Sequence, residues 1–539
     1  MMKTLLCFFF WCLFITSCTL KKEEKEIVPV LSIEQINIDS LLQKRFYSIS
    51  NTMVFANEKW VETVYNENNF KSIWIDNDMQ ISSLGNNVLN LLQNANYYGL
   101  EPNDYNSDEL QNLKRELKEV RTKEIFFKNV LNLEVLLTDN ILLFAKHLNH
   151  GKIENIDSLS ILERKALTIN IPKTFVEAVK NENVFDYFDN IQPKQLEYQK
   201  LRLAVQKFVQ KSNLSKENVH IQNFKEDSLR SNAQAKEALI LHQYISKKAS
   251  SSDLIEALKE FQMDHGLTPD GLIGKNTADA LSKSPYEFYQ NAVISLERWR
   301  WKPEWETSYI HINIPEYQLY YFKNDTLQLK SNVVVGRNYN KTPEIYSKLS
   351  YLIAYPFWNV PQSISVNEIM VNAKRDTSFM RRNNYEVFSK KMEEIPLKEM
   401  NWDTLNAKNF NLYIRQKGGS SNALGFVKFI FHNDFSIYLH DTPTKYYFNR
   451  DIRNYSHGCI RVEKAMQLAD TLLKSDQNEY NLDSVKSYIN RQKEKKMMFT
   501  QKLPIYLQYI TCSVDQNNRL IFYKDIYGYD DKIRKILFE

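Results

Sequence analysis

The first part of the chain, from about residue 33 to 200, carries apolar residues at helical spacing. One such face is formed by Leu84, Val88, Leu91, Leu92 and Ala95. The segment 130–148 is apolar on several sides, which is typical of a buried helix, and Gly151 follows it as a C-terminal cap. We therefore predict a helical scaffold domain over 33–200, with the 130–148 helix at its centre.

A second helical pattern lies between residues 236 and 284. The segment 254–262 is amphipathic, Asp270-Gly271 and Gly274 make tight turns, and 277–281 is a second short helix. The sequence order resembles the peptidoglycan-binding type 1 module, a small three-helix fold, in Phe261-Gln262, Gly266-Leu267, Asp270-Gly271, Ile273-Gly274, Thr277 and Ala280-Leu281. These residues maintain the fold, so the module either binds glycan or serves only as a three-helix spacer.

From about residue 305 the apolar pattern changes to that of strands. The predicted strands are 310–314, 318–322, 327–335, 351–360, 427–431 and 436–440, with a further alternating strand at 506–514 that contains Cys512. Their spacing favours a β-barrel or sandwich. The stretch 372–421 is polar and rich in Asn and Lys, without clear alternation, and is expected to be an inserted lid or loop.

Composition limits the class of protein. The 539 residues suggest two to four domains, and the net charge of +5 is modest for that length. There is no basic stripe with interleaved aromatic residues, so nucleic acid is not an expected partner. The many Tyr and Phe residues, 31 and 30, beside only 12 Gly, favour well-packed domains.

The N-terminus reads as an export signal. Lys3 precedes an apolar run at 5–15 that is too short to span a bilayer. The small residues before Cys18 resemble a bacterial lipoprotein lipobox, which implies a signal peptide over 1–17 and a lipid on Cys18; an ordinary signal peptide is the alternative. A charged linker follows over 18–32. We expect a protein of the cell envelope that faces the periplasm, lipid-anchored at the outer membrane.

One cysteine has the setting of a nucleophile. Cys7 and Cys12 lie in the leader, and the remaining three cysteines are too few for a disulfide framework. Cys459 stands in Ser456-His457-Gly458-Cys459-Ile460-Arg461, and fifteen residues separate this motif from His440 at a predicted strand end. His440 can act as the base, and the N–H groups of Gly458 and Cys459 can form an oxyanion hole.

Other interpretations of these side chains remain open. A zinc site formed by His432, His440, His457 and Cys459 lacks the usual paired ligand spacing, so we expect no metal and no cofactor. Cys459 can also be a buried small hydrophobe, which is the prediction for Cys512. A metal shared by His147 and His150 is disfavoured by their position at a helix end, and His265 and His311 are expected to be structural.

The motif and its surroundings resemble the L,D-transpeptidase family, in its large multidomain YcbB-type branch. The matching residues are His440, then Ser456-His457-Gly458-Cys459-Ile460-Arg461, together with Ile314-Pro315-Glu316-Tyr317, Val335-Gly336-Arg337, Lys341-Thr342-Pro343, Trp358-Asn359-Val360-Pro361, Asn422-Ala423-Leu424-Gly425 and His440-Asp441-Thr442-Pro443. The resemblance implies a multidomain α+β protein. It would have a helical scaffold domain, the three-helix peptidoglycan-binding module over 236–284, and a mostly-β catalytic domain over 305–525 with a capping subdomain inserted at 372–421.

The resemblance also implies a reaction and roles. Cys459 would attack the third residue of a peptidoglycan stem peptide and release the terminal D-alanine, and an amine of a second stem would take the acyl group in a 3→3 cross-link. His440 would donate and accept the proton, oriented by the carbonyl of Asp441. Ser456, His457 and Gly458 would shape the site, and Arg461 would meet a substrate carboxylate.

Two classes of alternative function remain. Transfer of the same acyl group to water would make the protein an L,D-carboxypeptidase or endopeptidase, and transfer to a protein amine would make it a wall-attachment enzyme. A lipoprotein that only tethers the envelope to peptidoglycan, without catalysis, is the third possibility. The expected partners in all cases are stem peptides and glycan strands, and the membrane through the lipid anchor.

Overall fold

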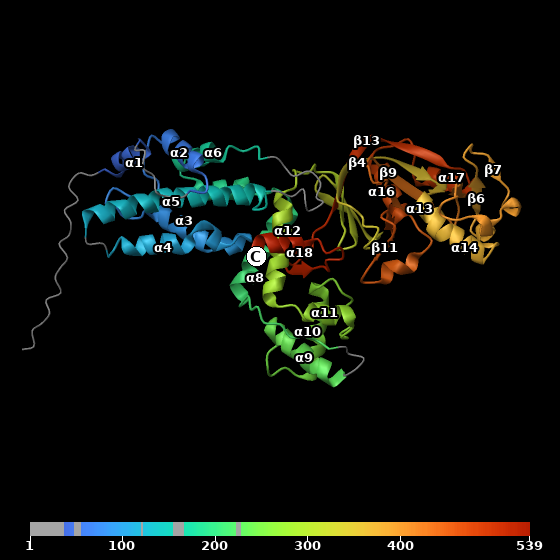
Figure 1. Ribbon diagram of the computed structural model, residues 1–539, viewed down its shortest axis with the longest axis horizontal. Coiled ribbons are helices and arrows are strands. Elements are labelled where there is room, and N and C mark those ends of the chain that lie inside the picture. The colour runs from blue at the N-terminus through green and yellow to red at the C-terminus, as the bar shows by residue number, and fades with distance from the viewer. Residues whose placement is uncertain (1–36, 48–54, 120–121, 155–166, 223–227) are drawn as a thin grey trace, which may run out of the picture.

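The structure is a computed structural model and describes residues 37–47, 55–119, 122–154, 167–222 and 228–539. The predicted signal peptide over 1–17, the predicted linker over 18–32 and the predicted lipidation site Cys18 lie outside the described residues. The molecule is elongated (Figure 1), with a helical region at one end, a β-rich domain at the other, and a small helical module beside the middle. None of the described helices is long and apolar enough to cross a membrane.

The long helix α5 (Lys123–His150) forms the centre of the helical region, as the apolar pattern predicted. Gly151 caps it with a positive φ of 83°. Around it pack six α-helices and two 3₁₀ turns, namely α1 (Ile38–Tyr47), α2 (Glu58–Glu67), α3 (Ser83–Gln93), η1 (Ala95–Tyr98), η2 (Pro102–Tyr105), α4 (Ser107–Glu116), α6 (Ile171–Lys180) and α7 (Val184–Ile191). The buried His147 contacts the Tyr105 hydroxyl at 2.9 Å, which satisfies its ring within the core.

The small module consists of α9 (Ser228–Leu241), α10 (Ser251–Asp264) and α11 (Lys275–Leu281), and α8 (Leu196–Lys211) connects it to the helical region. The predicted turn at Asp270-Gly271 is held by the buried Gln262. Its side-chain amide donates to the Asp270 carboxylate at 2.8 Å and accepts the Gly271 N–H at 2.8 Å. Gly271 has a φ of 72°, a conformation that favours glycine. The Asp-Gly sequence therefore fixes how α10 and α11 stack.

Helix α12 (Pro285–Arg300) joins the module, the helical region and the β-rich domain. It packs against α18 (Asp530–Phe538) and a hairpin of β14 (Cys512–Val514) and β15 (Leu520–Phe522). The single strand predicted over 506–514 is wrong, because β13 ends at Gln508 and β14 starts a separate sheet. Cys512 is fully buried in the core shared with the module, as predicted.

The β-rich domain contains a nine-stranded sheet in the order β11-β3-β12-β10-β9-β4-β13-β1-β2. Because β2 also pairs with β3, the sheet closes on itself as a barrel, in agreement with the strand spacing. The strands are β1 (Tyr309–Asn313), β2 (Gln318–Lys323), β3 (Thr326–Gly336), β4 (Ile345–Ala354), β9 (Val427–Phe431), β10 (Leu439–His440), β11 (Asn454–Ser456), β12 (Ile460–Val462) and β13 (Lys495–Gln508). Helices α16 (Ala465–Ser475) and α17 (Leu482–Asn490) pack on the barrel.

Two predicted strands have other bounds in the structure. The pattern at 351–360 divides, since β4 ends at Ala354 and the next strand belongs to a different sheet. The predicted strand at 436–440 is reduced to Leu439–His440. Ser436 has a φ of 57°, and the Asn433 side chain accepts the Ile437 N–H at 2.9 Å, so the residues before Tyr438 form a turn.

The polar stretch at 372–421 is not a loop or a simple lid but part of a folded unit, as the implied capping subdomain required, and this unit, called the insertion below, begins earlier, at Trp358. It contains a four-stranded sheet in the order β5-β8-β6-β7, formed by β5 (Trp358–Val360), β6 (Tyr385–Phe388), β7 (Glu394–Ile395) and β8 (Tyr413–Gln416). Its helical turns are α13 (Gln362–Ile364), η4 (Ser365–Ile369), α14 (Met370–Arg375) and α15 (Phe379–Arg382). The unit has its own apolar core around Val387 and Trp402. In Figure 1 it forms the end of the molecule.

Candidate active site

The register of three adjacent strands gathers the candidate residues on one face of the barrel sheet. His440 on β10 pairs with Lys428 on β9 and with Arg461 on β12. Because side chains alternate along a strand, Tyr438 and His440 point to the same face, and so do Cys459 and Arg461. The parallel register of β10 and β12 puts Cys459 beside Tyr438 and diagonal to His440. The sequence predicted His440, Cys459 and Arg461 here, and it missed Lys428 and Tyr438.

The Cys459 thiol is partly exposed at the start of β12, unlike the fully buried Cys512. Its Sγ lies 3.7 Å from the carbonyl oxygen of Ser436. Burial raises the pKa of the Cys459 thiol, while hydrogen bonding from Tyr438 and the positive charges of Lys428 and Arg461 act in the opposite direction. The thiol is therefore protonated at neutral pH and becomes a nucleophile only when a base removes its proton.

His440 is buried and held in one orientation. Its Nδ1 lies 2.5 Å from the carbonyl oxygen of Asp441, the contact that the sequence predicted. A carbonyl only accepts, so Nδ1 carries the proton and Nε2 has a free lone pair. Burial, followed by the charge of Arg461, lowers the pKa of His440 to about 3. The imidazole is therefore neutral at physiological pH and can accept a proton at Nε2.

The Asp441 side chain stabilises the loop behind His440. One carboxylate oxygen accepts the Phe426 N–H at 3.0 Å, and the other contacts the Lys445 ammonium at 2.6 Å. A Cβ at Gly425 would meet this carboxylate at 2.4 Å, so only glycine fits there. The Asp441 carboxylate thus acts on the site only through the backbone that holds His440.

Ser456 and Gly458 shape the turn that carries the thiol. Ser456 Oγ donates to the Cys459 carbonyl at 2.6 Å and accepts the Gly458 N–H at 3.1 Å. Gly458 has a φ of 114°, which favours glycine. The expectation that its N–H helps to form an oxyanion hole differs from the structure, because that N–H already donates to Ser456. Within the described residues the Cys459 N–H has no acceptor and stays available to an oxyanion.

His457 points toward the insertion. Its Nε2 lies 2.8 Å from Arg337 Nη2 and 2.5 Å from a carboxylate oxygen of Glu368, in the π-helical turn η4. Arg337 and Glu368 are themselves 3.8 Å apart. The sequence missed Glu368, since nothing in the pattern at 365–369 distinguishes it from other polar residues of the insertion. Arg337 stood in the Val-Gly-Arg motif, without an assigned role.

Arg461 is held at one end of its guanidinium. Nη1 donates to the Thr444 hydroxyl at 3.1 Å, and the guanidinium carbon lies 5.8 Å from the ring centre of Tyr447. Burial lowers the pKa of Arg461, although the group keeps its charge at physiological pH. The remaining N–H groups of the fork suit a carboxylate.

No group of three or more His, Cys, Asp or Glu side chains in the described part of the chain is placed to hold a metal ion. His440 and Cys459 are instead surrounded by cationic and phenolic groups, from Lys428, Arg461 and Tyr438. These side chains suit acid–base and nucleophilic chemistry.

Comparison with known families agrees with this geometry. Residues 307–483 match the family described as "L,D-transpeptidase catalytic domain", residues 59–204 match a "Scaffold domain", and residues 234–281 match a "Putative peptidoglycan binding domain". A protein of Haemophilus influenzae named "Putative L,D-transpeptidase" is 34% identical over 245 residues.

That alignment covers 45% of this chain and 49% of the relative, so the chain spans about half the length of the relative it matches. The catalytic-domain match contains His440 and the whole motif from Ser456 to Arg461. The chain thus contains a β-rich region similar to the L,D-transpeptidase catalytic domain, preceded by regions similar to a scaffold domain and a peptidoglycan binding domain.

Proposed function

We propose that the protein is a peptidoglycan L,D-transpeptidase that forms 3→3 cross-links through an acyl-enzyme on Cys459. The observation that carries the proposal is a neutral His440, fixed by the Asp441 carbonyl, on the same sheet face as a partly exposed thiol. Acyl transfer needs a nucleophile and a base that is held in a fixed orientation on the same side of the substrate.

The first half-reaction forms the acyl-enzyme. Cys459 Sγ attacks the carbonyl carbon of the third stem residue, and its proton moves to His440 Nε2. The Cys459 N–H donates to the oxyanion that develops on the carbonyl oxygen. Nε2 then gives its proton to the departing amine, so the peptide bond breaks and D-alanine leaves. The chain thus supplies base, nucleophile and acid without a cofactor.

The second half-reaction transfers the acyl group. The side-chain amine of a second stem attacks the thioester, His440 takes the amine proton, and the Cys459 thiol is restored. Arg461 and Lys428 flank His440 on the same face, so both are placed to attract the carboxylates of stem peptides. Transfer to water or to a protein amine uses the same residues and differs only in the acceptor.

We also propose where the protein acts. It would carry a lipid on Cys18, be anchored at the outer membrane and face the periplasm. The N-terminal residues that suggest this location lie outside the described residues. Peptidoglycan as a partner is supported by the match at 234–281.

The test uses intact-protein mass spectrometry. A carbapenem, whose strained amide acylates thiols of this kind, should add its mass once to the wild-type chain. Cys459→Ala should abolish the adduct, and His440→Ala should slow its formation by about 100-fold or more, the usual contribution of a general base. Cys512→Ala, which removes the buried thiol, is the matched control and should form the adduct normally.

A disaccharide-tetrapeptide substrate then distinguishes the acceptors. Cross-linked dimers support the transpeptidase proposal, and tripeptide without dimers supports the carboxypeptidase alternative. A persistent adduct in Cys459→Ala would place the nucleophile elsewhere. Normal wall attachment by Cys459→Ala, together with no adduct on the wild type, would leave the non-catalytic tether as the function.

A further inference from the structure

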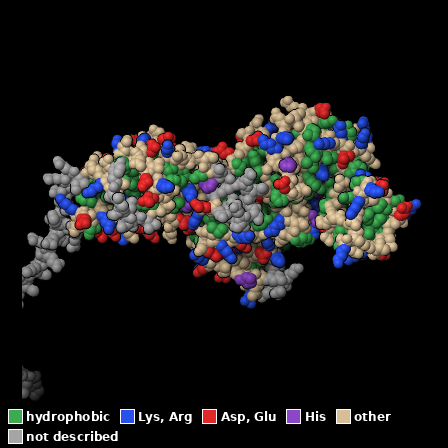
Figure 2. Space-filling model, turned by 45° about the horizontal axis from the view of Figure 1, so that its top comes forward, with side chains coloured by type: hydrophobic (Ala, Val, Ile, Leu, Met, Phe, Trp, Pro, Cys, Tyr) green, Lys and Arg blue, Asp and Glu red, His purple; other side chains and the backbone are tan. Residues whose placement is uncertain are grey.

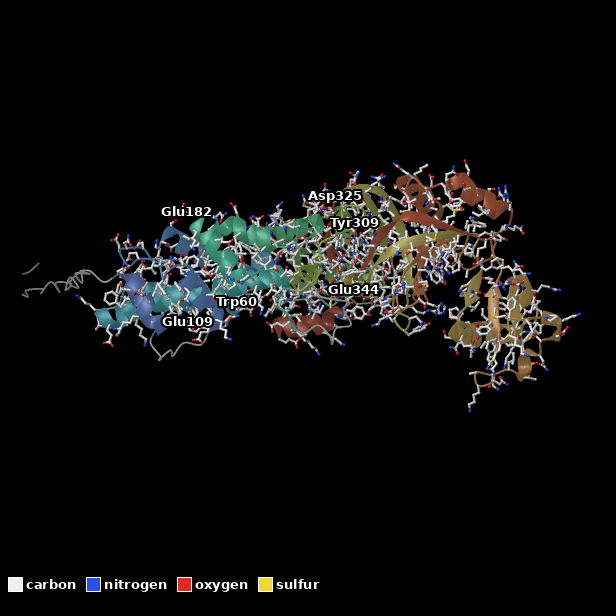
Figure 3. All side chains as sticks on the ribbon, turned by 90° about the horizontal axis from the view of Figure 1, so that it is seen from above. Trp60, Glu109, Glu182, Tyr309, Asp325 and Glu344 are labelled. Atoms are coloured by element: carbon white, nitrogen blue, oxygen red, sulfur yellow. The ribbon has the colours of Figure 1, made fainter. Side chains whose placement is uncertain are left out.

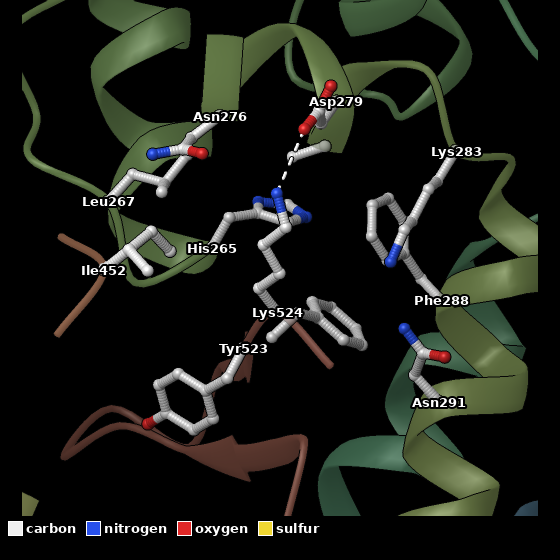
Figure 4. A pocket seen from close by; sticks show the side chains of 12 residues that line it. His265, Leu267, Asn276, Asp279, Lys283, Phe288, Asn291, Ile452, Tyr523 and Lys524 are labelled. Atoms are coloured by element: carbon white, nitrogen blue, oxygen red, sulfur yellow. Dashed lines mark hydrogen bonds and ion pairs between the residues drawn. The ribbon is translucent and has the colours of Figure 1, made fainter. Parts of the chain in front are cut away.

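A cavity of about 90 Å³ lies where the peptidoglycan-binding module meets the catalytic domain (Figure 4). It opens between the turn after α10, α11 and α12 on one side and the end of the β14–β15 hairpin on the other. Its walls include four rings and two amides, from His265, Phe288, Phe522, Tyr523, Asn276 and Asn291. The cavity is separate from the face that carries Cys459.

The aromatic walls are rigid and mostly apolar. The ring centre of Phe288 lies 4.8 Å from that of Phe522 and 4.7 Å from that of His265. Nδ1 of His265 lies 2.6 Å from the carbonyl oxygen of Phe261, which fixes the imidazole, and burial keeps its pKa at about 3. The aromatic walls therefore carry no charge at neutral pH and suit a small apolar group such as a methyl, while the Lys283 side chain lines the cavity beside Phe288.

The polar groups around the cavity can hold an amide. Asn276 makes no side-chain hydrogen bond within the described residues. The Asn291 carbonyl oxygen accepts from Arg534 at 2.6 Å, and in Figure 4 its amide nitrogen points toward Lys283 and Phe288. The donor of Asn291 and the free amide of Asn276 thus complement a carbonyl and an N–H of a bound group.

We propose that this cavity binds the acetamido group of an N-acetylated amino sugar in the glycan strand. An apolar cavity of about 150 Å³ holds benzene, which is roughly 25 Å³ per heavy atom, so about 90 Å³ suits the four heavy atoms of an acetamide. The methyl would contact Phe288 and Phe522, and the amide would bond to the two asparagines. The ion pair of Lys524 with Asp279, at 3.1 Å, borders the opening and can meet sugar hydroxyls.

The cavity also adjoins the loop that leads to the nucleophile. Ile452, four residues before Ser456, is part of its wall. The neighbouring Asp451 carboxylate accepts both the N–H of Thr268, at 3.1 Å, and its hydroxyl, at 2.6 Å. A sugar bound here would position a glycan strand beside the loop before the Cys459 motif. The inference rests on the proposed function, since it takes peptidoglycan as the substrate.

The experiment measures binding of two chemically matched oligosaccharides to the full mature chain by calorimetry. The probes are the β-1,4-linked tetramers of N-acetylglucosamine and of glucose, which are both neutral and differ in that a hydroxyl replaces each acetamido group. We expect the acetylated tetramer to bind at least 10-fold more tightly. Asn276→Leu, which replaces the free amide by an apolar group of similar size, should weaken its binding about 10-fold.

A second variant and a control complete the test. Ala280→Phe fills the cavity from α11 and should abolish binding, while Leu272→Ala, at a 61% exposed position of the module outside the cavity lining, should leave it unchanged. Equal binding of both tetramers, absence of binding to the wild type, or full binding by both cavity variants would each overturn the proposal. The carbapenem adduct on Cys459 should persist in all three variants. If the wild type forms no adduct, the proposed function is rejected, whereas the measured binding of the two tetramers still decides whether the cavity holds an acetamido group.

Discussion

At the scale of single residues, the protein keeps Cys459 and His440, the proposed nucleophile and base, neutral in the absence of substrate. Burial raises the pKa of the Cys459 thiol and lowers that of His440 to about 3, so a thiolate–imidazolium pair is disfavoured in the free protein. Deprotonation then has to accompany attack on the carbonyl. Such a thiol resists oxidation and unwanted alkylation better than a preformed thiolate.

The pH dependence of thiol alkylation follows from these shifts. Iodoacetamide reacts with the thiolate, so alkylation of Cys459 should be slow at pH 7 and keep rising above pH 9, because the thiol pKa is raised. Mass spectrometry of the Cys459 peptide over time measures it. A plateau of the rate below pH 7 would contradict the neutral pair.

Lys428 gives a charge-specific prediction at the same scale. Its ammonium lies 4.1 Å from the ring centre of Tyr438 and stabilises the Cys459 thiolate. Lys428→Met should raise the thiol pKa further and slow alkylation at pH 8 by about 3- to 10-fold, the effect of one nearby charge at the protein surface. Lys330→Met removes an exposed lysine that also lies over a tyrosine ring, 5.2 Å from Tyr320, and should have no effect.

At the scale of elements, the His457 side chain links the insertion to the motif that carries Cys459. The His457 ring lies within hydrogen-bond distance of both Arg337 and Glu368, so it bridges the end of β3 and the insertion. Glu368 sits in η4, and π-helical turns of this kind are frequent at functional sites. The contact therefore holds the folded insertion against the loop that presents Cys459.

We expect this contact to influence the choice of acceptor. Glu368→Ala should release the insertion, admit water and raise the ratio of hydrolysis to cross-linking several-fold, in line with the roughly 1 kcal/mol of a partly exposed pair. Liquid chromatography of the products from a tetrapeptide substrate gives the ratio as tripeptide over dimer.

The matched control for this prediction is Glu399→Ala, an exposed glutamate elsewhere in the insertion, which should leave the ratio unchanged. The rate of carbapenem adduct formation should stay within about 2-fold in both variants, since neither side chain contacts the thiol. An unchanged ratio in Glu368→Ala would show that the contact does not govern access of water.

At the scale of the whole molecule, buried charges join the domains at α12. Arg298 contacts Asp530 of α18 at 3.0 Å and Glu344, just before β4, at 3.6 Å, while Lys302 contacts Glu344 at 2.7 Å. All four side chains are at most 4% exposed. Figure 3 places Glu344 and Tyr309 where the helical region meets the barrel, far from Trp60, Glu109 and Glu182. On the face in Figure 2, by contrast, acidic and basic side chains are interspersed.

Removal of one partner from this cluster should be costly. Arg298→Met removes one cationic partner from the buried carboxylates of Asp530 and Glu344. It should therefore lower the free energy of unfolding of this junction by about 3–5 kcal/mol. Urea titration followed by tryptophan fluorescence reports on it, because Trp299 and Trp301 adjoin the cluster.

Arg382→Met is the control for the junction. It removes an exposed ion pair with Asp376 in the insertion, with the two side chains 58% and 43% exposed, and should cost less than about 1 kcal/mol. Equal shifts in the two variants would mean that the buried cluster contributes no more than a surface pair.

Local sequence by itself determined several elements and the core of the site. The apolar stripe and glycine cap of α5, the Asp-Gly turn of the module, and the alternating strands of the barrel follow from residues close together in the chain. Cys459 and His440 could be predicted because their types and spacing limit the chemistry, and their roles stay predictions. The contact of His440 with the Asp441 carbonyl was implied by the family resemblance and joins two residues adjacent in the chain.

Only the tertiary structure decided the rest, because the contacts join residues distant in the sequence. Lys428 and Tyr438 become part of the site through strand register, and Glu368 through the approach of the insertion to His457. The local pattern at 372–421 predicted only a lid or loop, because the strands there are short and the core residues widely spaced, whereas the family resemblance implied a capping subdomain. The cavity under the module likewise exists only because α11, α12 and the C-terminal hairpin meet there. Periodicity reports how one segment buries its own apolar face, whereas these sites depend on which segments meet.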